Sequence, residues 1–315
     1  MPRFFVPPAD FGADTVTLRG DNARHIAYAL RMAAGDTVTL CDGAGRAAVY
    51  RLARFAGDTV TAERLPDAVP DGELPLAVTL YMGMPKGDKL ELVVQKAVEL
   101  GAAAIVPFVG ERSVVRPRAE RAERQTERLS RIAQEAAGQC GRAVLPTVGA
   151  PLPFAAALAD AKSRGAQLLL CYEDEHALSL RRALEALRAA WAADGARAGQ
   201  AEGDAAFAGQ TENITGARTE GDNTTTKAPA GNEMPEAGAR PGTDGQSAPE
   251  TATRPNDSAR PSIALFVGAE GGISPAEVTA FRAAGGQTVT LGPRILRCET
   301  APLAALACVG FVFED

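Results

Sequence analysis

The pattern of apolar and polar positions divides the chain into two regions of different character. In the N-terminal region apolar residues mostly alternate with polar ones, as in strands that bury one face. The tetrapeptide DTVT begins at Asp14, Asp36 and Asp58, each time as an alternating strand after turn residues. A helical pattern runs from Asp21 to Met32, and another strand is expected from Arg46 to Phe55. The segments between the three copies differ too much for a repeat array, so a small β-barrel with one helix is predicted.

The remainder of the chain alternates between short apolar strands and amphipathic helices. In the first helix Leu90, Val93, Val94 and Ala97 share one face, and Asp88 is the expected N-cap. Strands are predicted at 76–82, 103–109, 144–148, 167–172, 262–268 and 287–291. Further helices are predicted at about 118–137, 153–164, 176–192, 275–284 and 299–312. This order predicts an α/β domain with a mostly parallel sheet that helices cover on both faces.

Residues 193–260 interrupt this pattern. They contain neither Leu nor Val, and Gly, Ala, Thr, Pro and Glu dominate. Such a composition buries too little apolar surface to offset the entropy of ordering, so we expect a disordered insert. The segment carries eleven acidic and six basic residues, so it accounts for −5 of the chain's net charge of −6. The folded part is therefore nearly neutral, and the acidic total does not exclude a nucleic-acid partner.

Composition excludes several classes of protein. The chain has 315 residues, of which 46% are hydrophobic, but no apolar run approaches the ~20 residues of a membrane span. The start, MPRFFVPPADFG, is not expected to be a signal peptide, because prolines break its short apolar run. The five cysteines include no C-x-x-C pair, so neither disulfides nor a zinc site is expected. A reducing cytoplasm fits best.

The first candidate site is the stretch GAEGGISPAEV, which follows a predicted strand. Ser274 and Glu277 form a capping box, with Pro275 at the first helical position. The stretch therefore lies at the carboxyl end of a strand, where open α/β sheets bind ligands. Gly268 and Gly272 permit close approach of the backbone, although a tight turn that needs glycines for packing alone is the competing interpretation. The spacing matches neither the G-x-G-x-x-G fingerprint nor the P-loop.

A second loop, LGPRILRCETA, follows the last predicted strand. Ile295 and Leu296 offer an apolar wall, flanked by Arg294 and Arg297, although arginines in such a loop are usually just solvated. Together with the stretch GAEGGISPAEV, the glycine loop, it could enclose a flat ring between backbone amides and aliphatic side chains. A third feature is the arginine-rich stretch from Val109 to Arg142, much of which has the i,i+4 charge pattern of an exposed helix.

Five stretches together resemble a known family. They are RHIAYALRMAAGD with DGAG, KGDKLELVVQKAVELGAAAIVPFVGERSV, RIAQEAAGQCGR, LFVGAEGGIS and LGPRILRCETA. The set is similar to the bacterial 16S rRNA uracil-N3 methyltransferases of the SPOUT class, and only 193–260 lies outside the likeness. Ala269 stands where many relatives have Pro, and Cys298 where Thr is common.

The resemblance implies a fold, a cofactor and a partner. Residues 1–72 should form a PUA-like RNA-binding barrel, and 73–315 a SPOUT-like methyltransferase domain with a C-terminal trefoil knot, a rare exception to unknotted chains. The knot should bind S-adenosylmethionine, the protein should be a homodimer, and the RNA partner should be 16S rRNA or the small ribosomal subunit. Neither a metal nor a membrane is expected to take part.

The resemblance also assigns roles to individual residues. Arg112 is the first candidate for a catalytic guanidinium, and Glu299 for a base or orienting group, although an N-cap role explains Glu299 equally well. The residues expected to bind the cofactor are Leu170, Gly268, Glu270, Gly272, Ile273, Leu291, Gly292, Ile295, Leu296 and Arg297. The arginines expected to bind RNA are Arg3, Arg24, Arg31, Arg116 and Arg142.

The chemistry explains why an arginine would matter. Uracil N3 carries a proton at neutral pH, and its loss places negative charge on the flanking carbonyl oxygens, which a fixed guanidinium would stabilise. Two other classes stay open on the residues alone: a non-catalytic RNA-binding protein with this fold, and an α/β enzyme that uses a nucleotide cofactor, such as a dehydrogenase.

Overall fold

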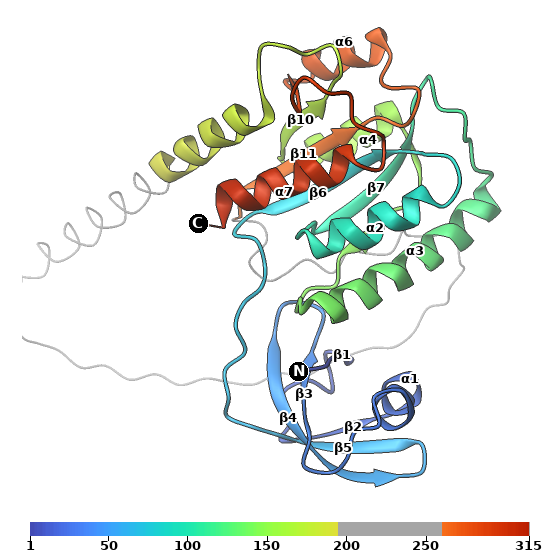
Figure 1. Ribbon diagram of the computed structural model, residues 1–315, viewed down its shortest axis with the longest axis vertical. Coiled ribbons are helices and arrows are strands. Elements are labelled where there is room, and N and C mark those ends of the chain that lie inside the picture. The colour runs from blue at the N-terminus through green and yellow to red at the C-terminus, as the bar shows by residue number, and fades with distance from the viewer. Residues whose placement is uncertain (195–259, 315) are drawn as a thin grey trace, which may run out of the picture. The chain divides into compact units, whose positions relative to one another are not determined.

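The computed structural model describes residues 1–194 and 260–314 (Figure 1). Nearly all of the expected insert at 193–260 therefore lies outside the described residues. The described parts contain two separate β-sheets, one from the N-terminal region and one from the rest of the chain.

The N-terminal region forms a curled five-stranded sheet in the order β1-β3-β4-β5-β2. Its strands are β1 (Arg3–Phe5), β2 (Thr15–Leu18), β3 (Thr37–Cys41), β4 (Ala47–Ala56) and β5 (Thr59–Arg64). The edge strands β1 and β2 are not neighbours in this order, so the expected barrel is an open one. The predicted helix is a single turn, α1 (Gly20–Arg24), continued by a π-helical turn at His25–Ala29. It ends before Arg31, whose φ of 53° is left-handed.

The second sheet has seven strands in the order β12-β10-β11-β6-β7-β8, with β9 also paired to β7. Every strand pair in it is parallel. The strands are β6 (Ala77–Gly83), β7 (Ala104–Val109), β8 (Thr147–Val148), β9 (Leu152–Pro153), β10 (Gln167–Cys171), β11 (Ser262–Val267) and β12 (Gln287–Val289). The parallel sheet predicted from the strand–helix alternation is therefore confirmed.

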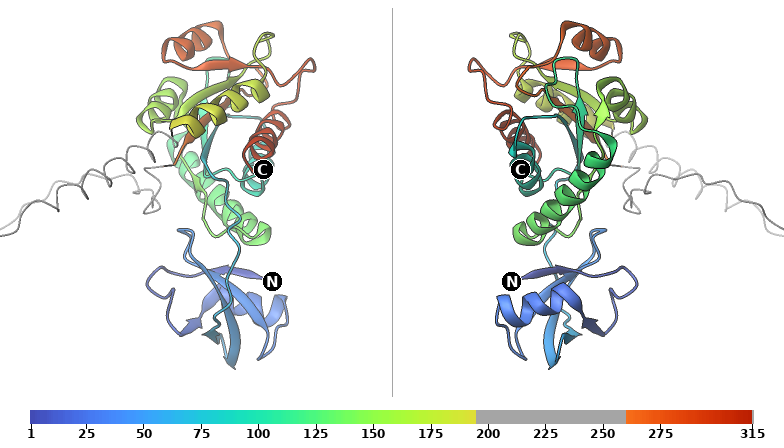
Figure 2. Two further views of the ribbon diagram at one scale, coloured as in Figure 1. Left: turned by 90° about the vertical axis from the view of Figure 1, so that its left-hand side faces the viewer. Right: turned by 90° about the vertical axis from the view of Figure 1, so that its right-hand side faces the viewer.

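Helices cover both faces of this sheet (Figure 2). They are α2 (Lys89–Glu99), α3 (Ala119–Cys140), α4 (Phe154–Ser163), α6 (Pro275–Ala283) and α7 (Ala301–Phe313), and residues 180–194 are also helical. On the face covered by α4 and α6, the Tyr81 and Phe266 rings stack with centroids 4.4 Å apart, and Phe154 and Phe281 pack around them. Helices α2 and α7 contact each other on the opposite face.

Two predicted elements differ in extent for physical reasons. The strand expected at 144–148 is short because Val144 bridges Gly43 of the N-terminal region, where the Leu145 amide donates to the Gly43 carbonyl at 2.9 Å. The helix expected from residue 176 begins only at 180, because Glu175 accepts hydrogen bonds from two backbone amides and from Thr288 in a turn. Sequence patterns also missed the short strands β1 and β9.

Candidate functional site

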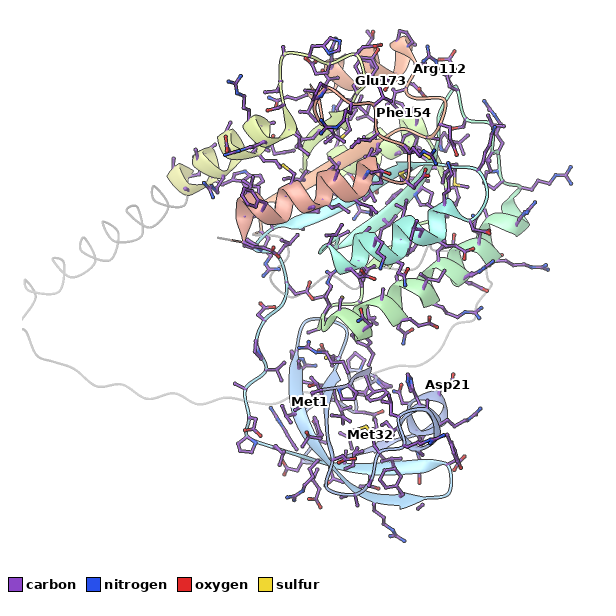
Figure 3. All side chains as sticks on the ribbon, in the orientation of Figure 1. Met1, Asp21, Met32, Arg112, Phe154 and Glu173 are labelled. Carbon is purple, nitrogen blue, oxygen red and sulfur yellow. The ribbon has the colours of Figure 1, made fainter. Side chains whose placement is uncertain are left out.

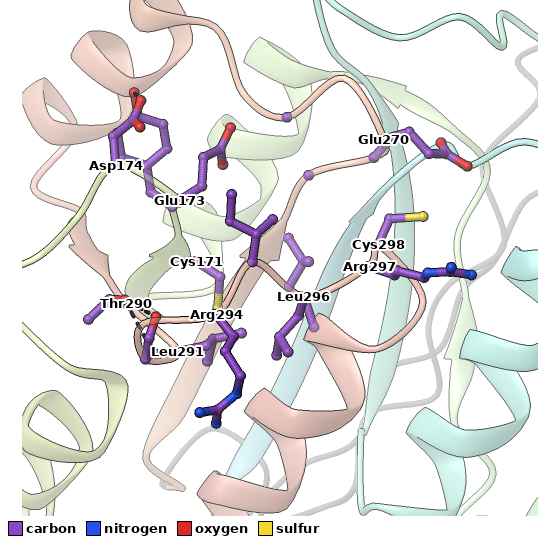
Figure 4. A pocket seen from close by; sticks show the side chains of 18 of the residues that line it. Cys171, Glu173, Asp174, Glu270, Thr290, Leu291, Arg294, Leu296, Arg297 and Cys298 are labelled. Carbon is purple, nitrogen blue, oxygen red and sulfur yellow. Dashed lines mark hydrogen bonds between the residues drawn. The ribbon is translucent and has the colours of Figure 1, made fainter.

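Three loops converge on one pocket at the carboxyl edge of the parallel sheet (Figure 4). They follow β10, β11 and β12, and the pocket has a volume of about 910 Å³. Strand β10 lies between β11 and β12 in the sheet. Residues 171–174, at its carboxyl end, therefore line the pocket together with the two loops that the sequence predicted. Glu173 and Asp174 lie on one side of the pocket, and Glu270 and Cys298 on the other (Figure 4). The pocket is thus wide, mixed in polarity, and placed where parallel sheets bind ligands.

The glycine loop ends in the predicted capping box. The Ser274 hydroxyl accepts from the Glu277 amide at 3.2 Å, and the Glu277 carboxylate accepts from the Ser274 amide at 2.9 Å. Gly272 has φ of +67°, and a Cβ there would collide with the Glu173 carboxylate. A Cβ on Gly268 would lie 3.2 Å from the Gly272 backbone. Packing of the loop on itself and on its neighbours therefore requires these glycines, and this packing sets the shape of the pocket wall.

The loop after β7 carries Arg112 to the same rim. A Cβ on Gly271 would lie 2.6 Å from the Arg112 carbonyl oxygen, so the two backbones are in close contact. Glu277 holds this loop, because its Oε1 accepts from the Glu111 amide at 2.8 Å. Figure 3 labels Arg112 and Glu173, which come from the loops after β7 and β10. Arg112 is exposed and does not itself line the pocket.

The loop after β12 forms the opposite wall. Ile295 is 88% exposed at the pocket and Leu296 is half-buried, so the predicted apolar wall is present and largely open to solvent. Helix α7 begins at Ala301 with Thr300 in the N-cap position. The alternative N-cap role of Glu299 is therefore wrong, and its carboxylate instead pairs with Lys89 at 3.1 Å.

Lys89 is the centre of a small charged cluster that sequence reasoning missed. Its Nζ lies 3.0 Å from Glu270 Oε1, 3.1 Å from Glu299 Oε2 and 3.6 Å from the Cys298 sulfur. The Cys298 thiol donates to Glu299 at 3.2 Å. The only signal for Lys89 was its place in the KGDK stretch of the resemblance, because contacts between residues 89, 270 and 299 require the tertiary fold.

Hydrogen bonds within this cluster perturb its pKa values. The pKa of Glu299 falls to about 2, because its own backbone amide, the Cys298 thiol and Lys89 all donate to the carboxylate. Burial opposes the same shift in Glu270, but its own amide and Lys89 still lower its pKa. Burial and the neighbouring Glu299 carboxylate raise the pKa of Cys298 to about 12. Both glutamates are therefore fixed anions, and the thiol stays protonated.

Most of the residues predicted to bind the cofactor line the pocket. These are Gly268, Glu270, Gly272, Leu291, Gly292, Ile295, Leu296 and Arg297. Leu170 and Ile273 do not line the pocket, because they are 0% and 1% exposed and belong to the core beneath it. Their side chains point into the sheet–helix interface, a direction that sequence spacing did not reveal. The pocket residues missed by sequence include Lys89, Glu173 and Asp174.

The predicted RNA-binding arginines fall into two groups. Arg24, Arg31 and Arg116 are exposed. Arg3 is half-buried, with its guanidinium beside Gly141 and its Nη1 atom buried, so it does not present an open phosphate contact. Arg142 requires a correction. It is 3% exposed and bonded to Glu73 at 2.7 Å, so it cannot contact RNA.

No helix in residues 1–194 and 260–314 is long and apolar enough to cross a membrane. No three His, Cys, Asp or Glu side chains in those ranges are grouped as ligands for a metal ion. The five cysteines are free thiols.

Comparison with known families now decides the class of protein. A model described as an RNA methyltransferase domain matches residues 72–200 and 240–310. The chain belongs to this RNA methyltransferase family. A second model, described as an RNA methyltransferase PUA domain, matches residues 18–63. The resemblance seen in the sequence is confirmed, and so is the fold class of a parallel α/β domain of SPOUT type with a small PUA-like sheet.

Named relatives cover almost the whole chain of this RNA methyltransferase. Ribosomal RNA small subunit methyltransferase E of Bacillus subtilis (strain 168) is 28% identical over 302 residues, which cover 96% of this chain and 92% of that protein. The crystal structure of ribosomal RNA small subunit methyltransferase E from Neisseria gonorrhoeae, bound to S-adenosyl methionine, aligns with a TM-score of 0.66 and 28% identity. That alignment covers 98% of this chain and 97% of the other. A probable rRNA methyltransferase from Porphyromonas gingivalis, at 22% identity and a TM-score of 0.63 over 100% of this chain and 99% of that one, shares the fold.

Proposed function

We propose that this protein transfers the methyl group of S-adenosylmethionine to N3 of a uracil in 16S rRNA. The observation that carries the proposal is the 910 Å³ pocket at the carboxyl edge of β10, β11 and β12, in a chain of the RNA methyltransferase family. The N. gonorrhoeae relative, which aligns with this chain over 97% of its own length, is bound to this cofactor.

The lining of the pocket fits the chemistry of S-adenosylmethionine. Leu291 and Leu296 offer aliphatic surface for an adenine ring. The carboxylates of Glu173 and Asp174 suit the cationic groups of the cofactor, and the guanidinium of Arg294 suits its carboxylate. A pocket of this size lies within the range of cofactor sites, roughly 300–1,000 Å³. The ten residues predicted to bind the cofactor, without Leu170 and Ile273, therefore remain our candidates.

The chain's own residues position and polarise the uracil. When bound, S-adenosylmethionine supplies an electrophilic methyl group. Arg112 offers an exposed guanidinium at the rim, where it would stabilise negative charge on the uracil oxygens as N3 loses its proton. Glu277 holds the backbone beside Arg112 in place. Glu299 is a poor base because its pKa is about 2, so we assign it an orienting role.

The proposal extends to partners. The PUA-like sheet would bind rRNA, with Arg24 and Arg31 among its exposed cations. A homodimer would cover the exposed apolar side chains of Leu92 on α2 and Phe311 on α7, which are 44% and 69% exposed on helices that contact each other. A cytoplasmic location follows from the rRNA substrate and agrees with the free thiols. The division into domains at residues 72 and 73 belongs to the same proposal.

The deciding experiment combines binding with mapping of the product. Calorimetry should give a micromolar Kd for S-adenosylmethionine, and mass mapping should show that 16S rRNA from cells lacking the protein has lost one methylated uridine. The purified protein should restore that methyl group on small subunits from the deletion strain. Binding of RNA without binding of S-adenosylmethionine would instead favour a non-catalytic RNA-binding protein.

A further inference from the structure

Lys89 joins three segments that are far apart in the sequence. It is the first residue of α2, Glu270 belongs to the glycine loop after β11, and Glu299 belongs to the loop after β12. One ammonium nitrogen contacts both carboxylates, at 3.0 and 3.1 Å. The amide of Lys86, just before the same helix, also donates to Glu270 at 3.2 Å. The start of α2 therefore holds both walls of the pocket.

The charges of the cluster explain why a cation is needed at this point. Because both carboxylate oxygens lie within 3.1 Å of the same nitrogen, Glu270 and Glu299 are neighbours. Two carboxylates so close repel each other unless a cation lies between them. Without Lys89 the loops would separate or the glutamates would turn away, and either change would widen the pocket. Lys89 and Glu270 also line the pocket, so the effect would be local to the ligand.

We infer that Lys89 is a positioning residue that holds the loop after β11 against the loop after β12 and so sets the affinity for S-adenosylmethionine. The inference rests on the proposed function, since it takes S-adenosylmethionine as the occupant of the pocket. Lys89 acts through the loops and does not take part in the chemical step. The cluster is also sensitive to ionic strength, because Lys89 is 37% exposed.

The test compares substitutions at two lysines of one helix. Lys89→Met removes the cation between the loops. Lys96→Met is the matched control, since Lys96 is also on α2, is 40% exposed, and pairs with Glu99 at 2.8 Å away from the pocket. Calorimetry should show an increase in Kd for S-adenosylmethionine of about tenfold for Lys89→Met, because two partly exposed ion pairs are lost together. Lys96→Met should bind as the wild type does.

Three further measurements separate positioning from a general loss of structure. Lys89→Arg keeps a cation that reaches both carboxylates, so its Kd should stay within about threefold of the wild-type value. In Lys89→Met the KM for S-adenosylmethionine should rise, whereas the rate at saturating cofactor should stay within about threefold of the wild-type rate. In a Glu299→Gln background, Lys89→Met should weaken binding less than it does alone, because the repulsion is already relieved.

The outcomes that would overturn the inference are distinct. Equal affinities for Lys89→Met and Lys96→Met would show that Lys89 does not position the loops. An unchanged Kd with a rate that stays low at saturating cofactor would make Lys89 part of the chemical step. If Lys89→Met unfolds, the Lys89→Arg variant decides, and a loss of affinity as large as tenfold there would refute the inference. A wild-type protein that does not bind S-adenosylmethionine would refute the proposed function itself.

Discussion

Replacing Glu73 by alanine should destabilise the fold strongly, although Glu73 does not line the pocket. The Glu73 and Arg142 side chains are 5% and 4% exposed. The guanidinium of Arg142 donates to Glu73 Oε2 at 2.7 and 3.0 Å, and to the carbonyls of Val98 and Ala102 at 3.1 and 2.6 Å. Glu73 Oε1 also accepts from the amides of Ala143 and Val144. Removal of this carboxylate leaves a buried cation and two partly buried amides without this acceptor.

The magnitude follows from this geometry. Loss of one partner of a buried ion pair costs about 3–5 kcal/mol, because the remaining charge stays out of water. For a folded unit of this size that corresponds to a decrease in Tm of about 6–20 °C. The matched control is Glu91→Ala. Glu91 pairs with Arg128 at 2.8 Å, but the side chains are 26% and 65% exposed, so its loss should cost less than about 1 kcal/mol.

Urea unfolding at neutral pH, followed by circular dichroism, measures both free energies of unfolding. Replacement of both charged partners by apolar residues, as in Glu73→Leu with Arg142→Met, should recover much of the lost stability. The double variant should also bind RNA with the same salt dependence as the wild type, since Arg142 does not reach RNA. Equal and small effects of Glu73→Ala and Glu91→Ala would refute the buried ion pair and would return Arg142 to the candidate RNA contacts.

Three other predictions concern the proposed activity. Arg112→Ala should leave the Kd for S-adenosylmethionine nearly unchanged but slow single-turnover methylation by roughly 10²–10³-fold. Arg112→Lys should restore little of the rate, since the point charge of an ammonium does not replace the planar guanidinium. A normal rate of Arg112→Ala at saturating RNA would exclude this role. The affinity for small-subunit RNA should fall steeply as the salt concentration rises, and a double variant, Arg24→Gln with Arg31→Gln, should reduce the slope of log K against log salt concentration. A wild-type affinity that does not change with salt would count against phosphate contacts. The Glu299 carboxylate, with its pKa lowered to about 2 in the fold, contributes stability that is present above its ordinary pKa of about 4.3 and lost as the pH falls toward 2. The difference in stability between wild type and Glu299→Gln, followed by urea unfolding, should therefore shrink from pH 5 downward, and a constant difference would contradict the assigned pKa.

Local patterns were sufficient for most elements of the parallel sheet and for the capping box. The strand–helix alternation predicted most strands and helices to within a few residues, because burial on one or both faces imposes a period on the sequence itself. Ser274, Pro275 and Glu277 specified the start of α6 for the same reason, since the hydrogen bonds that cap the helix lie within one helical turn. The trefoil knot had no such signal and was expected only from the resemblance.

Contacts between distant segments were beyond the reach of these patterns. The sequence placed Leu170 and Ile273 at the correct sheet edge, but it could not show whether they face the pocket or the core. It also assigned Arg142 to RNA, because nothing in an arginine-rich stretch reveals that one member is buried against Glu73. A side chain's direction depends on the sheet to which its strand belongs and on the residues packed against it.

Sequence patterns alone were thus enough for the kinds of elements, for two of the loops that line the pocket and, through the motifs, for the family. Two features emerged only in the folded chain: β10 lies between β11 and β12 and brings Glu173 to the pocket, and Lys89 pairs with both Glu270 and Glu299. This division reflects the range of the interactions. Periodicity and capping act within a few residues, whereas strand order and ion pairs are set by the packing of the whole sheet, which brings residue 89 against residues 270 and 299.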